Sequence, residues 1–74
     1  MNYTDRMKGL RQDKDLTQKQ IANKLGVAQN SYSQYESGIR SIPIELLIEL
    51  CKMYDVSADY MLGISNIKNR YPKK

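Results

Sequence analysis

Apolar residues recur at helical spacing along most of the chain. Tyr3, Met7 and Leu10 fall at i, i+4 and i+7, which places them on one face of a helix over about residues 3–13. No apolar/polar alternation longer than a few residues is present, so strand signals are absent. The pattern therefore predicts an all-α protein.

The clearest helix boundaries enclose residues 17–25. Thr17 is a good N-cap, and Gln20 stands three residues later, where a capping box requires Glu or Gln. Gly26 follows the last apolar residue and can adopt the left-handed conformation that closes a helix. We expect a sharp turn directly after this helix.

A second short helix follows this turn almost at once. It is predicted over about Gln29–Tyr35, with Gly38 as the next stop signal, and Tyr32 and Tyr35 lie on one side of it. Two short helices separated by a few residues that include a glycine have the geometry of a helix-turn-helix. In that motif the second helix enters the major groove of DNA.

Two more helices are predicted in the second half of the chain. The first begins around Ile42–Pro43, because proline is tolerated in a first helical turn. Most of its residues are apolar, and the polar ones form a single stripe, so we expect it to be central and buried on most sides: Glu45, Glu49 and Lys52. A last short helix extends from an N-cap at Ser57 to Gly63.

Composition limits the function more than it defines it. The chain has 74 residues, one cysteine and no histidine, which predicts one domain without a His/Cys zinc site or a Ser-His or Cys-His catalytic pair. Asp13 and Asp15 lie in a turn without a partnered base, so we expect no enzyme activity and no cofactor. The single cysteine and the lack of a targeting segment indicate a cytoplasmic protein.

The net charge of +4 is unevenly distributed. The segment after Gly63 carries all of it, which suggests a domain over residues 1–64 and a basic tail over residues 65–74. Within the domain, residues 1–42 hold seven bases and four acids, net +3, while residues 43–63 hold one base and four acids, net −3. This polarisation indicates one face suited to a polyanion, although ordinary scatter of surface charge would explain it equally well.

The segment TQKQIANKLGVAQNSYSQYESG, Thr17–Gly38, resembles the helix-turn-helix of the Xre family, which includes phage Cro and cI-type repressors. The resemblance extends over about residues 7–63. It implies a five-helix lambda-repressor-like fold and a DNA-binding transcriptional regulator, most often a repressor that binds a palindromic operator as a homodimer. Apolar residues occupy the five inward-facing positions of the motif: Ile21, Leu25, Val27, Tyr32 and Tyr35.

The resemblance also implies roles for single residues. Arg11 and Glu36 match a pair that forms a salt bridge in related repressors, and Gln18 matches a residue that holds the DNA backbone. Two positions depart from the family pattern. Tyr32 replaces a common Ile or Val, so its hydroxyl needs a partner or the surface. Ala28 stands where a Ser or Thr cap is usual.

The exposed face of the predicted recognition helix carries amides and hydroxyls. Amide side chains match adenine N6 and N7, serine can contact several bases, and an alanine methyl can meet a thymine methyl. We therefore expect base contacts from Ala28, Gln29, Asn30, Ser33 and Gln34. Contacts to the DNA backbone are expected from Gln18, Ser31, Ser37, Gly38 and Arg40.

Two questions stay open at this level. The isoleucines flanking the last helices either close the core or form a self-complementary dimer patch: Ile39, Ile42, Ile44, Ile64 and Ile67. The fold could also serve an antitoxin or another protein-binding module in which DNA binding is secondary. Cys51, in the helix after Pro43, is expected to be a buried core thiol.

Overall fold

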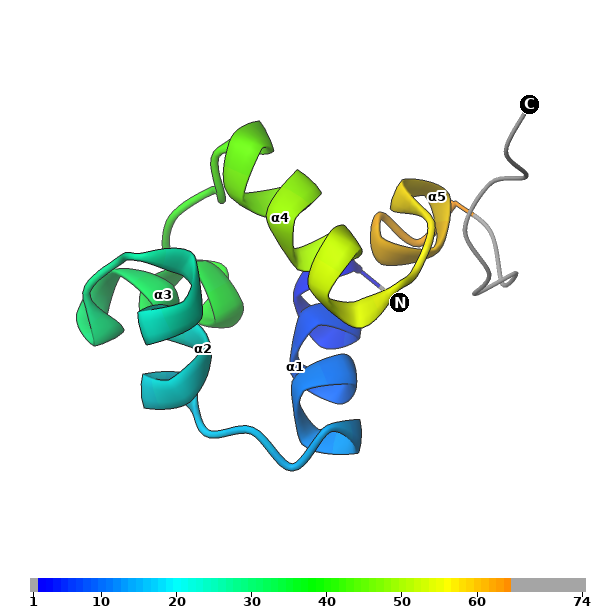
Figure 1. Cartoon of the computed structure of the whole chain (residues 1–74). Helices are drawn as coiled ribbons and strands as arrows, with labels where there is room; N and C mark the ends of the chain where they lie inside the picture. The colour runs from blue at the N-terminus through cyan, green and yellow to red at the C-terminus, as the bar shows by residue number, and fades with distance from the viewer. Residues whose placement is uncertain (1, 65–74) are drawn as a thin grey trace.

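The computed structural model of the chain describes residues 2–64, which form five helices and no strand (Figure 1). The helices are α1 Tyr3–Asp13, α2 Gln18–Leu25, α3 Gln29–Ser37, α4 Ile44–Tyr54 and α5 Ala58–Met61. The all-α, five-helix fold predicted from the sequence is confirmed. The predicted basic tail, with Ile67, lies outside the described residues.

The capping signals in the sequence define the helix boundaries. The Thr17 side chain accepts a hydrogen bond from the Gln20 backbone N–H, and the Gln20 side chain accepts one from the Thr17 N–H, which completes a capping box. Gly26 adopts a left-handed conformation with φ of 73° and ends α2. α3 starts without a side-chain cap at Ala28 and extends two residues beyond the predicted end, to Ser37.

All five helices contribute side chains to one hydrophobic core. α2 packs against α3, α1 packs against α3 and α5, and α4 packs against α2 and α5. In Figure 1, α2 and α3 lie on one side of α1, α5 lies on the other side, and α4 spans the top. The largest fully buried side chains come one from each of the five helices: Met7, Ile21, Tyr32, Leu50 and Met61.

The expectation that the helix after Pro43 is buried on most sides is wrong. Pro43 is the N-cap of α4 rather than part of its first turn. Leu47 and Leu50 are buried, but Ile44 is 59% exposed and Ile48 is 46% exposed. The main contacts of α4 are with α2 and α5, and they cover the side that carries Leu47 and Leu50 but leave the flanking apolar positions Ile44 and Ile48 exposed.

The exposure of the isoleucines shows which of them close the core, and the burial of Cys51 tests its expected place there. Ile42 packs against the core, whereas Ile39 and Ile64 are 74% and 73% exposed. Core closure therefore accounts for Ile42 and not for the other described isoleucines of this set. Cys51 is buried as predicted, and this burial raises the pKa of its thiol.

Candidate nucleic-acid interface

The outer face of α3 is polar, and residues 28–35 include no charged side chain. Ala28, Gln29 and Asn30 are exposed, while Ser31, Ser33 and Gln34 are half-buried at the edges of that face. The opposite side of the helix is fixed in the core by Tyr32 and Tyr35. The helix therefore presents a row of hydrogen-bonding groups on a rigid support.

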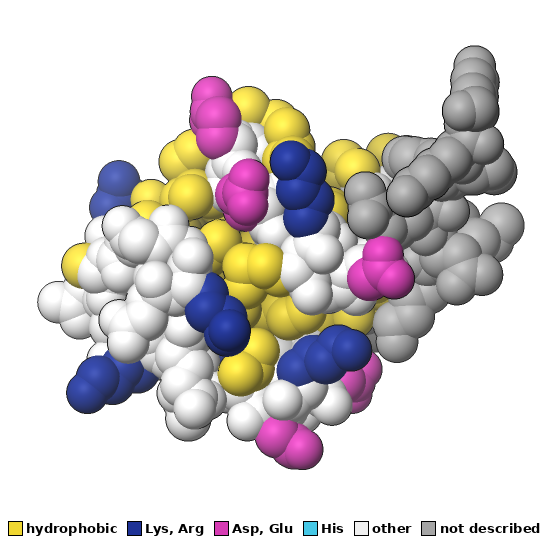
Figure 2. All heavy atoms as spheres, viewed as in Figure 1, with side chains coloured by type: hydrophobic (Ala, Val, Ile, Leu, Met, Phe, Trp, Pro, Cys, Tyr) yellow, Lys and Arg dark blue, Asp and Glu magenta, His cyan; other side chains and the backbone are white. Residues whose placement is uncertain are grey.

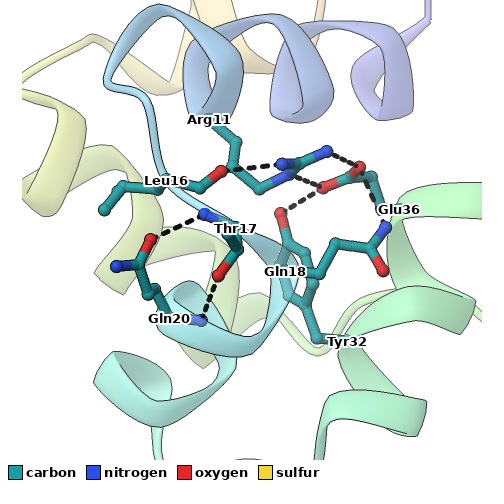
Figure 3. A network of polar contacts seen from close by, with 7 residues as sticks. All are labelled: Arg11, Leu16, Thr17, Gln18, Gln20, Tyr32 and Glu36. Carbon is teal, nitrogen blue, oxygen red and sulfur yellow. Dashed lines mark hydrogen bonds and ion pairs between the residues drawn. The ribbon is translucent and has the colours of Figure 1, made fainter.

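A buried ion pair joins the last turn of α3 to α1 (Figure 3). Arg11 Nε donates to Glu36 Oε2 at 2.9 Å, and Arg11 Nη2 donates to Glu36 Oε1 at 2.9 Å. Arg11 Nη1 also donates to the backbone carbonyl of Leu16 at 2.7 Å, which connects the α1–α2 turn to the same group. The ion pair expected from the family resemblance is thus present in its two-pronged form.

Two further donors complete the shell of the Glu36 carboxylate. The Tyr32 hydroxyl donates to Oε2 at 2.6 Å, and Gln18 Nε2 donates to Oε1 at 3.2 Å. Tyr32 is fully buried, so its hydroxyl finds the partner that this departure from the family pattern requires. Three helices, α1, α2 and α3, therefore meet at one carboxylate.

These contacts keep the pair ionised. Burial alone would raise the pKa of Glu36, but the hydrogen bonds from Arg11, Tyr32 and Gln18 hold that pKa below its usual value. The hydrogen bond to Glu36 raises the pKa of the Arg11 guanidinium. Burial, followed by the bond to Glu36, raises the pKa of the Tyr32 hydroxyl, which therefore stays protonated as a donor.

The start of α2 contributes to a hollow beside the ion pair. Gln18 is the first residue of α2, and its amide nitrogen is used by Glu36, which leaves its carbonyl oxygen for another partner. The hollow is lined by Lys8, Arg11, Gln18, Ser33, Glu36 and Ser37. Lys8, an exposed lysine that lines this hollow, was not predicted as a site residue from the sequence. Its spacing of three from Arg11, which places both on one face of α1, was the available signal.

The turn after α3 gathers the remaining predicted residues. Ser37, Gly38 and Arg40 are exposed, and Gly38 has a left-handed φ of 83°. Arg40 Nη1 donates to Gln34 Oε1 at 3.4 Å, and the guanidinium lies 5.5 Å from the centre of the Tyr35 ring. Gln34 is therefore partly engaged within the protein.

Within residues 2–64, no group of three or more His, Cys, Asp or Glu residues is placed to hold a metal ion. No helix in the same range combines the length and the apolar character that crossing a bilayer requires.

The sequence of this chain is similar to proteins named as transcriptional regulators and to an antitoxin. The chain is 41% identical over 64 residues to YobD, an uncharacterized HTH-type transcriptional regulator of Bacillus subtilis; the match covers 86% of this chain and 57% of YobD. It is 37% identical over 54 residues to RstR, the cryptic phage CTXphi transcriptional repressor of Vibrio cholerae, covering 73% of this chain and 49% of RstR. It is 36% identical over 63 residues to the antitoxin PezA of Streptococcus pneumoniae, covering 85% of this chain and 40% of PezA.

The fold and the paired helices α2 and α3 define a helix-turn-helix domain. A helix-turn-helix family profile matches residues 7–61, and the chain belongs to this Xre-type family. The chain spans between 40% and 57% of the length of the three curated relatives described above.

Removing one partner of the buried pair should be costly. We expect Arg11→Met to lower the free energy of unfolding by about 3 kcal/mol, because the Glu36 carboxylate would stay buried without its cation. Lys14→Met is the matched control, since Lys14 is exposed, and it should change stability by less than about 0.5 kcal/mol. Urea unfolding at pH 7 measures both values. An equal decrease in the free energy of unfolding in the two variants would show that the Arg11–Glu36 pair does not stabilise the fold.

The lowered pKa of Glu36 predicts a loss of stability in acid. Below the usual glutamate pKa of 4.5, the unfolded chain binds a proton that the folded carboxylate does not, so stability falls as the pH falls. Glu36→Gln lacks this carboxylate and cannot lose its contribution. The difference in the free energy of unfolding between the native protein and this variant should therefore shrink as the pH falls from 7 to 3. Urea unfolding across this range tests the prediction. A stability deficit for Glu36→Gln that stays constant across this range would contradict the assignment.

Proposed function

We propose that this chain is the DNA-binding part of a sequence-specific transcriptional regulator, acting in the cytoplasm as a repressor. In this proposal two copies bind a palindromic operator, and each inserts α3 into the major groove. The observation that carries the proposal is the exposed row of amide and hydroxyl groups on a helix held by a buried ion-pair network. Half-sites would then lie about 34–36 Å apart, one turn of DNA.

Base recognition is assigned to the exposed face of α3. Gln29 and Asn30 are the most accessible amides, and each can pair with adenine N6 and N7, while the Ala28 methyl can meet thymine. Ser33 and Gln34, one turn further along, lie at the edge of the same face. No Lys or Arg occurs between residues 25 and 39, so the two-pronged contact of arginine with guanine is not available from α3.

Backbone contacts are assigned to residues that border this face. Gln18 lines one hollow with Lys8, whose ammonium adds a charge that the polar face of α3 lacks, and Ser31 is half-buried at the edge of α3. In the turn after α3, Ser37, Gly38 and Arg40 are exposed; the Gly38 N–H already donates to the Tyr35 carbonyl, so Ser37 and Arg40 carry the expected phosphate contacts there. These groups would position the protein on DNA, and the amides of α3 would read the sequence.

The similarity to proteins named as transcriptional regulators, and to a phage repressor, supports regulation of transcription. Few cationic side chains border α3, so one copy should bind weakly and two copies should be needed for useful affinity.

A second candidate function is a protein-binding module of the antitoxin type, with DNA binding secondary. The similarity to the antitoxin PezA favours it. A second protein that copurifies with the full chain at a fixed ratio, together with uniform binding to random duplexes, would support this alternative over the first.

Selection from randomised duplex DNA should enrich a palindrome with A·T pairs in each half-site. Asn30→Ala should weaken binding to the selected duplex by about 5- to 150-fold for each half-site, because one base contact is lost at each. Asn23→Ala is the matched control, since Asn23 is an exposed amide on α2 away from the reading face, and it should bind like the native protein. A titration of each variant measures the effect, and equal binding by both variants would remove α3 from recognition.

The phosphate role of Lys8 predicts a change in salt dependence. Lys8→Gln should reduce the slope of log K against log salt by about 1 for each contact removed, with equal weakening on the operator and on random duplex. Lys14→Gln, an exposed lysine beyond the end of α1, should leave the slope unchanged. Titrations at several salt concentrations give the slopes. An unchanged slope in Lys8→Gln would show that this lysine is only a surface residue.

A further inference from the structure

An apolar strip runs along the uncovered side of α4. Ile44 and Ile48, one helical turn apart, are 59% and 46% exposed, and Leu62, beyond α5, is 41% exposed. The three residues border one hollow, which is also lined by Leu47, Cys51, Lys52, Val56, Ser57 and Ala58. Single exposed apolar residues are ordinary, but a continuous strip beside an apolar hollow is typical of an interaction surface.

One edge of this strip carries both signs of charge. Glu45, Glu49 and Lys52 are exposed along α4, and Figure 2 shows acidic and basic side chains together on this helix, next to exposed hydrophobic side chains. Within the chain, Lys52 Nζ lies 4.0 Å from Glu49, and both side chains are more than half exposed. A contact of this kind is weak, so both charges remain accessible to a partner.

The spacing of these charges is self-complementary. Glu45 and Lys52 are seven residues apart, which places them on the same edge of the helix, two turns from each other. A two-fold axis perpendicular to α4 would bring in a second α4 running antiparallel, with its charged edge on the same side. Each Glu45 would then face Lys52 of the other copy, and the two Ile48 side chains would meet near the axis.

We propose that the α4 strip is the surface through which two copies of this chain associate, in an antiparallel α4–α4 contact with a reciprocal pair of Glu45–Lys52 ion pairs. The inference deepens the two-copy operator binding proposed above. A second copy suits this surface better than DNA, because residues 43–63 carry a net charge of −3, which repels a polyanion. An isologous contact requires a patch that complements itself, and the seven-residue spacing of Glu45 and Lys52 along one edge supplies this property.

The test measures self-association of the full chain by sedimentation equilibrium, without DNA, from about 1 μM to 1 mM protein. We expect a monomer–dimer equilibrium that Ile48→Gln weakens at least tenfold. Ile39→Gln is the matched control, since Ile39 is equally apolar, 74% exposed and outside the strip, and it should leave the equilibrium unchanged. Circular dichroism checks that each variant keeps its helical content.

Charge reversal makes the test specific to the geometry. Glu45→Lys alone and Lys52→Glu alone should each weaken the dimer about tenfold, because each turns two attractive pairs into two repulsive ones. The double variant should restore the native equilibrium. A chain that stays monomeric at all concentrations, as expected if another segment or another protein covers α4, would overturn the proposal. A dimer that is indifferent to Ile48→Gln, or a double variant that is no better than the singles, would also overturn it.

Because the assay contains no DNA, its result is independent of base recognition by α3. A dimer that follows these expectations but enriches no DNA sequence would leave the α4 surface in place and refute only the proposed regulator.

Discussion

The arrangement of this small domain depends on the Glu36 carboxylate, which is buried and receives hydrogen bonds from Arg11, Gln18 and Tyr32. α3 has nine residues and no side-chain cap at its start, so it is too short to be stable alone. The carboxylate fixes its last turn to α1 and to the start of α2. A buried charge of this kind is favourable only when all its partners are present, so the network holds α3 in one position rather than several. In the proposed regulator, this order is established on folding and does not have to be gained on DNA.

The two halves of the domain have different surface chemistry. Residues 1–42, which contain the helix-turn-helix, are net positive, and residues 43–63, which contain α4 and α5, are net negative. The positive half offers hydrogen-bonding groups on α3, with Lys8 in the hollow beside the helix and Arg40 in the turn that follows it. The negative half offers an apolar strip edged by both signs of charge. In the proposed regulator, DNA contact and self-association therefore use separate surfaces of one core.

Local signals in the sequence predicted the helices well, and the tertiary environment was harder to predict. Thr17, Gly26 and Ser57 marked boundaries because capping depends on neighbouring residues alone. The exposure of Ile44 and Ile48 was missed, because an apolar helix does not reveal which of its sides has a neighbour. The bond between Gln18 and Glu36 depends on three helices meeting, so no local pattern contained it. The Arg11–Glu36 pair came only from the family resemblance.

In the proposed regulator, α3, held by the Arg11–Glu36 pair, is the surface that reads DNA. Nuclear magnetic resonance of the isotope-labelled full chain, titrated with its selected duplex, tests this role residue by residue. We expect the largest shifts at the amides of residues 28–34 and 37–40, with the Arg11 Nε–H signal protected from exchange both free and bound. Shifts concentrated on α4 and α5 while the α3 amides stay unchanged would contradict it.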